Sequence, residues 1–225
     1  MSLVVKICGL STPETLEAAL GAGADMAGFV FFPPSPRHVA LEAARELGRL
    51  AAGRAAKGAL TVDADHTTLA NIVETLRPDW LQLHGRESIA RVRDIKQRFG
   101  LPVMKAIAVE SRADLGAVPD YAEVADRILF DARAPQDATR PGGLGVPFDW
   151  HLLDAIAGDR SFMLSGGLSI ANVAEAIGIA RPGGVDVSSG VERAPGLKDS
   201  EMIRAFIRAA RGAESALPHT KVASA

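Results

Sequence analysis

The amino-acid sequence predicts a single-domain (β/α)8 barrel, the TIM-barrel class of α/β fold. Short β-rich runs begin near residues 3, 26, 58, 80, 103, 126, 161 and 184, and most of them precede a segment with helical periodicity. Strands separated by helices pair in parallel, and eight such units can close into a barrel. An open doubly wound sheet is the alternative architecture.

Length and composition are those of an ordinary globular domain. The chain has 225 residues, 48% hydrophobic and 23% charged, which suits one barrel with one large core. The net charge of −2 provides no basic surface for nucleic acid or an anionic membrane. A single cysteine excludes an intramolecular disulfide and favours a reducing compartment. With no signal-peptide pattern and no spanning apolar run, we expect a cytoplasmic protein, monomeric or homodimeric.

Helix signals support the alternation of strands and helices. Two segments place apolar residues on one helical face: Leu69, Ile72, Val73 and Leu76, and Ile170, Val173, Ala174 and Ile177. Helix starts are predicted at Ser11 with Glu14, where Pro13 falls in the first turn, and at Ser111 with Asp114. Residues 1–212 are therefore expected to form the barrel, and residues 213–225, which lack periodicity, a flexible tail.

Two connections are longer than the others. The second and sixth intervals between strand starts are 32 and 35 residues, against 22 or 23 elsewhere, and the extra residues fall at 32–38 and 132–147. Because the loops that follow barrel strands build the active face, these insertions predict functional loops.

Strand alternation places several polar side chains inside the barrel. Outward apolar residues leave the inward positions to Lys6, Cys8, Gln82, His84, Asp131, Asp186 and Ser188. Each has an ordinary structural explanation: Cys8 as a small buried hydrophobe, His84 as a hydrogen-bonded core residue, and Lys6 with Asp186 as a buried ion pair. Barrel interiors are normally apolar, so the convergence of these groups near the strand ends predicts a site.

Glycine-rich segments follow the last two predicted strands. Gly166 and Gly167 follow the seventh, and Ser188, Ser189 and Gly190 follow the eighth. Barrels often hold phosphate at this place, because glycines let backbone N–H groups approach an oxyanion. The two segments together predict a phosphate-binding site.

Seven ordered motifs resemble those of the phosphoribosylanthranilate isomerase family of tryptophan biosynthesis. They are KICG at 6–9, SPR at 35–37, QLHG at 82–85, LFDA at 129–132, GGLG at 142–145 with FDW at 148–150, SGGL at 165–168, and GVDVSSGVE at 184–192. The resemblance spans residues 5 to about 208. This chain departs from the family where Leu144 replaces a usual threonine and Pro34 a common lysine.

The resemblance implies an Amadori rearrangement of a small-molecule sugar phosphate, with no cofactor and no metal. Asp131 would be the general acid and Cys8 the general base. Arg37 would bind the anthranilate carboxylate bidentately through its planar guanidinium. His84 and Asp186 would contact the substrate, and the two glycine-rich segments would hold the phosphate.

Each of the two catalytic roles requires a particular protonation state. A neutral thiol is a poor base, so we expect the inward Lys6 to lower the pKa of the Cys8 thiol. Asp131 must hold a proton near neutral pH, and we expect burial against the loop at 132–147 to favour that form.

Three other functions compete with this interpretation. A metal-dependent sugar-phosphate epimerase would use Asp63, His84 and Asp131 as ligands. An isomerase of the histidine-pathway aminoimidazole ribotide would use two aspartates, whereas this chain has Cys8 on the first strand. A phosphate-binding module without catalysis is the third alternative.

Overall fold

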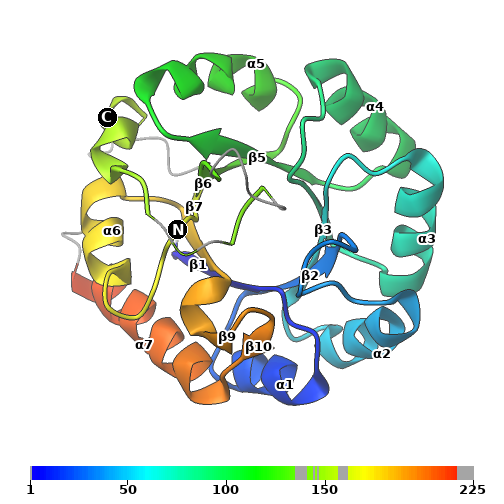
Figure 1. Cartoon of the computed structure of the whole chain (residues 1–225), viewed down its shortest axis with the longest axis horizontal. Helices are drawn as coiled ribbons and strands as arrows, with labels where there is room; N and C mark the ends of the chain where they lie inside the picture. Colours follow the sequence, from blue (N-terminus) through cyan, green and yellow to red (C-terminus); the bar gives the residue numbers. More distant parts are fainter. Residues whose placement is uncertain (1, 135–140, 144, 146, 157–161, 217–225) are drawn as a thin grey trace, which may run out of the picture.

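The computed structural model describes residues 2–134, 141–143, 145, 147–156 and 162–216. Its eight parallel strands close into a barrel in sequence order, with the helices forming a ring around them (Figure 1). The predicted fold is confirmed. The strands are β1 (Val4–Cys8), β2 (Met26–Phe31), β3 (Ala56–Thr61), β4 (Trp80–Leu83), β5 (Val103–Val109), β6 (Arg127–Ala132), β7 (Met163–Leu164) and β8 (Gly184–Val187).

Helices follow the strands and cover the outside of the barrel. Those of α type are α1 (Pro13–Gly21), α2 (Leu41–Ala51), α3 (His66–Leu76), α4 (Ile89–Phe99), α5 (Val118–Ala122), α6 (Val173–Ala180) and α7 (Ser200–Ala216). Short 3-10 helices are η1 (Arg112–Ala117), η2 (Trp150–Ala155) and η3 (Ser189–Val191), and η2 occupies the place of a helix between β6 and β7. Within the described ranges, none of these helices has the length and apolar character required to cross a membrane.

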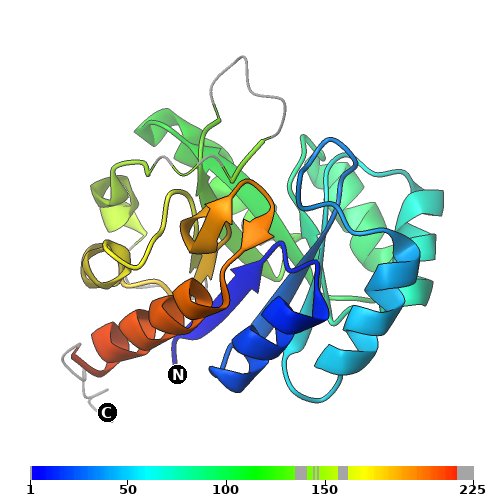
Figure 2. The ribbon, with the colours of Figure 1, turned by 60° about the horizontal axis from the view of Figure 1, so that its bottom comes forward.

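A small hairpin that the sequence did not predict follows β8. It consists of β9 (Glu192–Ala194) and β10 (Leu197–Lys198), which pair antiparallel with Glu192 opposite Lys198. Figure 2 shows the arrow of β1 pointing toward the rim on which this hairpin lies. The hairpin therefore stands at the carboxyl end of the strands.

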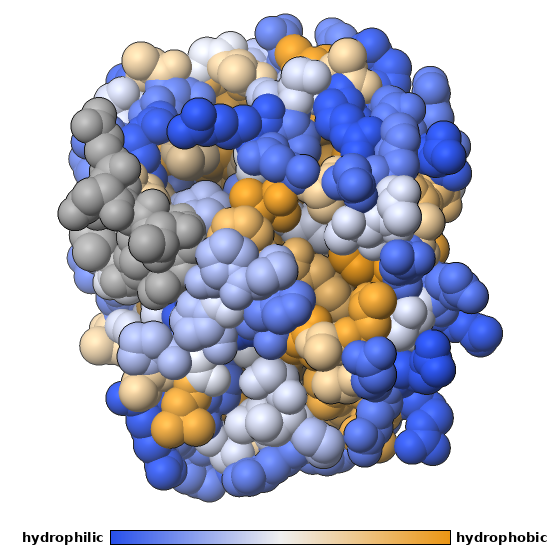
Figure 3. Space-filling view, turned by 45° about the vertical axis from the view of Figure 1, so that its right-hand side comes forward, coloured by the Kyte–Doolittle hydropathy of each residue, from blue (hydrophilic) through white to orange (hydrophobic). Residues whose placement is uncertain are grey.

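The alternation of strand side chains is confirmed by the packing. Val5, Ile7, Leu81 and Val185 belong to one extended apolar core between the strands and the helices. A second, much smaller apolar cluster fills the inside of the barrel and consists of Met26, Met104, Ala106, Leu129 and Met163. On the outer surface in Figure 3, hydrophilic side chains predominate and apolar areas are small.

Two details of the helix predictions are wrong. The cap of α1 is Thr12, whose side chain accepts from the backbone N–H of Thr15, so the helix begins one residue later than Ser11 predicts. Pro13 at the first helical position has no N–H to satisfy, which suits this start. In α6 the helix begins only at Val173, and Ile170 is 37% exposed. The stripe on α3 is confirmed, because Leu69, Ile72 and Leu76 are buried.

The remaining boundaries differ in smaller ways. Ser111 and Asp114 form the predicted capping box, but it opens the 3-10 helix η1 rather than an α-helix. Helix α7 continues to Ala216, so residues 213–216 of the expected tail are helical. Residues 217–225 of the tail, together with 135–140, 144 and 146 of the long loop, lie outside the described residues.

Candidate active site

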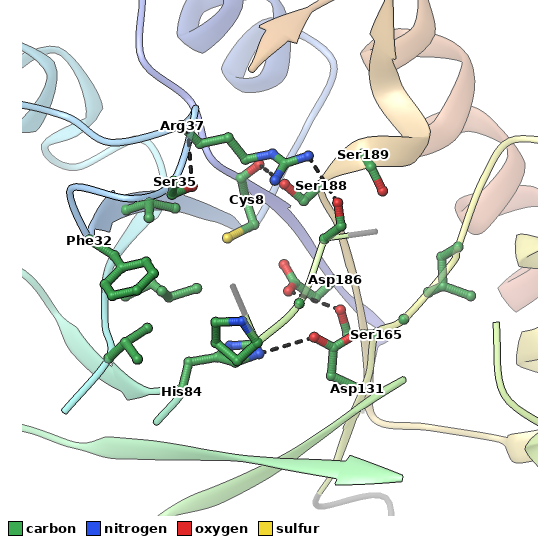
Figure 4. Close-up of a pocket in the computed structure, with 18 of the residues that line it drawn as sticks. Cys8, Phe32, Ser35, Arg37, His84, Asp131, Ser165, Asp186, Ser188 and Ser189 are labelled. Carbon is green, nitrogen blue, oxygen red and sulfur yellow. Dashed lines mark hydrogen bonds and ion pairs between the residues drawn. The ribbon is translucent and has the colours of Figure 1, made fainter. Parts of the chain in front are cut away.

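An open pocket of about 640 Å³, which includes space open to solvent, lies at the carboxyl ends of the strands. This is the end at which barrels carry their active sites. Its lining includes all the predicted catalytic and substrate-binding side chains and four of the five predicted phosphate-binding residues: Cys8, Arg37, His84, Asp131, Asp186, Gly166, Gly167, Ser188 and Ser189. Figure 4 shows Cys8 and Asp131 reaching the pocket from different strands, with Arg37 lying above Cys8.

Cys8 ends β1 and is 3% exposed. Its register partner on β2 is Gly28. A Cβ added at Gly28 would lie 3.1 Å from the Cys8 Sγ and 3.0 Å from the Lys6 Nζ. The absence of a side chain there leaves room for both. Burial raises the pKa of the Cys8 thiol above its ordinary value, and the ammonium groups of Lys6 and Lys198 offset only part of this shift. Lys6 lowers the pKa of the thiol as expected, but desolvation is the larger effect and the net pKa is raised.

Lys6 and Asp186 form a buried ion pair, with Nζ and Oδ1 2.8 Å apart. They are register partners on the adjacent strands β1 and β8, which close the barrel. The other carboxylate oxygen of Asp186 accepts from the Ser165 hydroxyl at 3.3 Å. Burial lowers the pKa of Lys6, but Asp186 and Cys8 outweigh that effect, and the pKa of Lys6 is raised. Asp186 lines the pocket, yet both of its oxygens already have partners in the protein.

His84 joins Asp131 to Gln82 by a chain of hydrogen bonds. Its Nε2 lies 3.0 Å from the Asp131 Oδ2, and its Nδ1 lies 3.2 Å from the Gln82 Nε2. The other oxygen of Asp131 accepts from the backbone N–H of Ala132 at 3.0 Å. The predicted substrate-binding His84 therefore contacts the predicted acid directly.

Arg37 is held by a carboxylate of the protein itself. Its Nε and Nη2 donate to the two oxygens of Glu192, each at 2.7 Å, and Nη2 also donates to the Gly143 carbonyl. Glu192 occupies the Nε–Nη2 edge of the guanidinium, so this edge is not available for a substrate carboxylate. Among the described residues, none accepts from Nη1, and this nitrogen would lie 2.7 Å from a Cβ at Gly143.

Glu192 and Lys198, two residues without a predicted role, complete this network. Lys198 donates to Glu192 at 2.8 Å and also to the Ser188 carbonyl and hydroxyl oxygens. Burial favours the protonated Glu192, but hydrogen bonds from Arg37 and the charge of Lys198 bring its pKa below the ordinary value. The motif at 184–192 contains Glu192, whereas no periodic signal marked Lys198, because its hairpin is too short.

The two glycine-rich segments lie together at the pocket. Among the described residues, the backbone N–H groups of Gly166 and Gly167 make no hydrogen bond to a backbone carbonyl, so they are available to an anion. Gly190 has a different part: a Cβ there would lie 1.9 Å from the Leu168 carbonyl oxygen. Its missing side chain lets the two segments pack against each other.

The metal-ligand set of the epimerase alternative is not assembled. Asp63 accepts from the backbone N–H of Arg86, while His84 and Asp131 contact each other. In the part of the chain that the structure describes, no group of three or more His, Cys, Asp or Glu side chains has the arrangement of a metal site.

Comparison with known proteins assigns this chain to a family. The family model described as N-(5'phosphoribosyl)anthranilate (PRA) isomerase matches residues 5–209. The chain is 77% identical to an N-(5'-phosphoribosyl)anthranilate isomerase of Bradyrhizobium sp. strain BTAi1, over 95% of this chain and 98% of that protein.

Solved structures agree with this finding. The crystal structure of phosphoribosyl anthranilate isomerase from Thermotoga maritima is 36% identical, with a TM-score of 0.84, covering 93% of this chain and 99% of that one. A second structure, of the isomerase in complex with reduced 1-(o-carboxyphenylamino)-1-deoxyribulose 5-phosphate, is 34% identical over the same shares, with a TM-score of 0.80.

Proposed function

This chain belongs to the N-(5'-phosphoribosyl)anthranilate isomerase family, and on that premise we propose how its pocket rearranges the substrate. The reaction converts N-(5-phosphoribosyl)anthranilate to 1-(2-carboxyphenylamino)-1-deoxyribulose 5-phosphate in tryptophan biosynthesis. Asp131 is the general acid and Cys8 the general base. The observation that carries this assignment is the position of both groups in one pocket, on strands β6 and β1 of the closed barrel.

The reaction needs one proton donor and one proton acceptor. Asp131 gives its proton to the furanose ring oxygen as the bond from that oxygen to the first carbon breaks, which leaves an open-chain imine whose nitrogen is protonated. Cys8 then removes the proton from the second carbon, and the electron pair of that C–H bond produces an enolamine. The enolamine tautomerises to the ketone, so no electrons leave the substrate and no cofactor is required.

The surroundings of Asp131 support its role as acid. Oδ1 is fixed by the backbone N–H of Ala132, so Oδ2, the oxygen next to His84, is the atom that carries the proton. The Asp131 side chain is 6% exposed. Low exposure keeps water from competing for the proton.

The surroundings of Cys8 place a condition on its role as base. Because burial raises the pKa of the thiol, the thiolate is scarce near neutral pH. Lys6 and Lys198 both favour the thiolate. The Cys8 thiol must lose its proton before it can act as the base. We therefore expect kcat to increase as the pH rises above neutral.

Two anionic groups of the substrate have complementary partners. We assign the phosphate to Gly166, Gly167, Ser188 and Ser189, which line the pocket, while Gly190 lets the two glycine-rich segments pack closely. Arg37 receives the anthranilate carboxylate through Nη1, since Glu192 holds the other edge of the guanidinium. We also assign Asp186 to substrate binding, and its ion pair with Lys6 holds the carboxylate in place.

The test is to change each catalytic group without changing its size. Cys8→Ser and Asp131→Asn should each lower kcat by at least about a hundredfold, within the range attributed to a positioned acid or base. The assay follows loss of anthranilate-type fluorescence when the purified protein is incubated with phosphoribosylanthranilate.

Binding of the reduced product analogue serves as the control, because both variants should retain it. Near-normal kcat in Cys8→Ser would assign the thiol to packing, and near-normal kcat in Asp131→Asn would remove the acid. Binding with no turnover by the parent protein would favour the phosphate-binding module instead.

A further inference from the structure

The chain of hydrogen bonds behind Asp131 contains an amide with two possible orientations. Gln82 is 1% exposed and lies inside the barrel on β4, two residues before His84. Its Nε2 is 3.2 Å from the His84 Nδ1, and among the described residues its buried Oε1 has no hydrogen-bond partner. Turning the amide by 180° exchanges the two ends, so a donor or an acceptor can face the imidazole.

The amide orientation decides where the neutral imidazole carries its proton. If Gln82 donates to Nδ1, the ring proton sits on Nε2 and donates to Asp131, which favours a carboxylate anion. If Gln82 accepts from Nδ1–H, the lone pair of Nε2 faces Asp131 instead. That lone pair accepts a hydrogen bond from a protonated carboxyl group and repels a carboxylate.

Figure 4 shows the contact between His84 and Asp131 in the lining of the pocket, where both side chains are largely buried. His84 and Asp131 side chains are 11% and 6% exposed. Gly142 covers their contact: a Cβ there would lie 2.3 Å from the Asp131 Oδ2 and 3.0 Å from the His84 Nε2. In such surroundings hydrogen bonds are electrostatically stronger than in water.

We propose that Gln82 is a positioning residue whose amide oxygen accepts from the Nδ1–H of His84, which turns the unprotonated Nε2 toward Asp131. Each orientation of the amide leaves one of its ends without a partner, so the chemistry at Asp131 decides between them. A general acid must hold its proton before the substrate ring opens, and of the two neutral tautomers only the one protonated on Nδ1 lets Nε2 accept a hydrogen bond from that acid. This inference rests on the proposed role of Asp131 as acid. Gln82 does not touch the substrate; it acts through His84.

The first test reads the tautomer directly in the full-length protein. Nitrogen-15 NMR of the five histidines, with the His84 signals assigned by their loss in His84→Asn, should show a neutral ring protonated on Nδ1. A ring protonated on Nε2, or on both nitrogens, overturns the proposal. This readout does not depend on the catalytic assignment.

The second test compares an acceptor with a side chain that cannot accept. Gln82→Met should lower kcat by at least about tenfold, a part of the roughly 10²–10⁴ that a positioned acid contributes, with KM nearly unchanged. Gln82→Glu keeps an oxygen facing Nδ1–H and should retain more of the kcat than Gln82→Met. A parent-like kcat in Gln82→Met, or a lower kcat in Gln82→Glu than in Gln82→Met, contradicts the proposal.

Two further variants separate this inference from the proposed function. On an Asp131→Asn background, Gln82→Met should lower kcat no further, because the residue through which it acts is gone. An additional loss there would overturn the positioning role, whereas a normal kcat in Asp131→Asn alone would reject the acid. Thr61→Val is the matched control, since Thr61 is a buried residue of the neighbouring strand whose hydroxyl has no hydrogen-bond partner among the described residues. It should change neither kcat nor the His84 tautomer.

Discussion

The two faces of the barrel wall differ in chemistry although they are built from alternate residues of the same strands. In β1, Val5 and Ile7 face the helices and are fully buried in apolar surroundings, while Lys6 and Cys8 face the inside. The apolar cluster inside the barrel is small and rich in methionine. The main apolar packing and the proposed catalytic groups therefore lie on opposite faces of one sheet.

The inner face and the hairpin at the rim of the barrel keep their charges by pairing them. Lys6 with Asp186 and Lys198 with Glu192 each have an ammonium nitrogen 2.8 Å from a carboxylate oxygen. A buried pair contributes little net stability, because desolvation cancels much of the attraction, but loss of one partner leaves a costly unpaired charge. The inner face is tuned for its charge arrangement, whereas the outer face is tuned for apolar packing.

The largest expected effect comes from breaking the outer face. Leu69 on α3 is fully buried, and Leu69→Ala should lower the free energy of unfolding by about 2–5 kcal/mol through lost packing. Urea denaturation measures the change, and the kcat of the folded enzyme should stay at the parent value. Leu197→Ala is the control, because Leu197 is 60% exposed and its loss should cost little. A large loss of kcat in Leu69→Ala would show that the two faces are coupled.

A smaller effect is expected from Arg37 on the inner side. Arg37→Lys keeps the charge but loses the guanidinium geometry that Glu192 holds. We expect kcat/KM to decrease by at least about tenfold, or about 1.4 kcal/mol, with little change in the free energy of unfolding. Steady-state kinetics and denaturation on the same preparation separate the two quantities. An unchanged kcat/KM would remove Arg37 from substrate recognition.

The smallest expected effect is on the pH dependence of alkylation at Cys8. The chain has one cysteine, so iodoacetamide reports this thiol alone. Because burial raises its pKa, the thiolate fraction is below that of an exposed thiol near neutral pH and still increasing where the exposed one levels off. From pH 8 to pH 9 the rate should increase more than the roughly threefold of a thiol with an ordinary pKa near 8.5.

A cysteine placed at an exposed position provides the reference for this measurement. Leu197→Cys in a Cys8→Ser background should follow the ordinary curve. If Cys8 follows that curve as well, burial does not raise the pKa of its thiol. Alkylation of Cys8 in the parent should also abolish turnover.

Some predictions from sequence were wrong where one local pattern admits two readings. Ser11 and Thr12 are both good helix caps, and only the position of Pro13 in the folded turn selects Thr12. Ile170 matched a helical stripe, but the chain there belongs to the turn before α6. These errors shift an element by one or a few residues and do not change the architecture.

The sequence by itself determined the barrel and the set of inward side chains, because both follow from local periodicity. Strand alternation has a period of two residues, so the outward position of Val5 and Ile7 was enough to place Lys6 and Cys8 inside. Strand alternation also suggested the Lys6–Asp186 pair, but the tertiary structure decided which of the other polar groups meet. Arg37 reaches Glu192 across 155 residues of sequence through a hairpin without a periodic signal. The pKa of Cys8 likewise depends on how completely the closed barrel excludes water, and a local pattern does not contain that quantity.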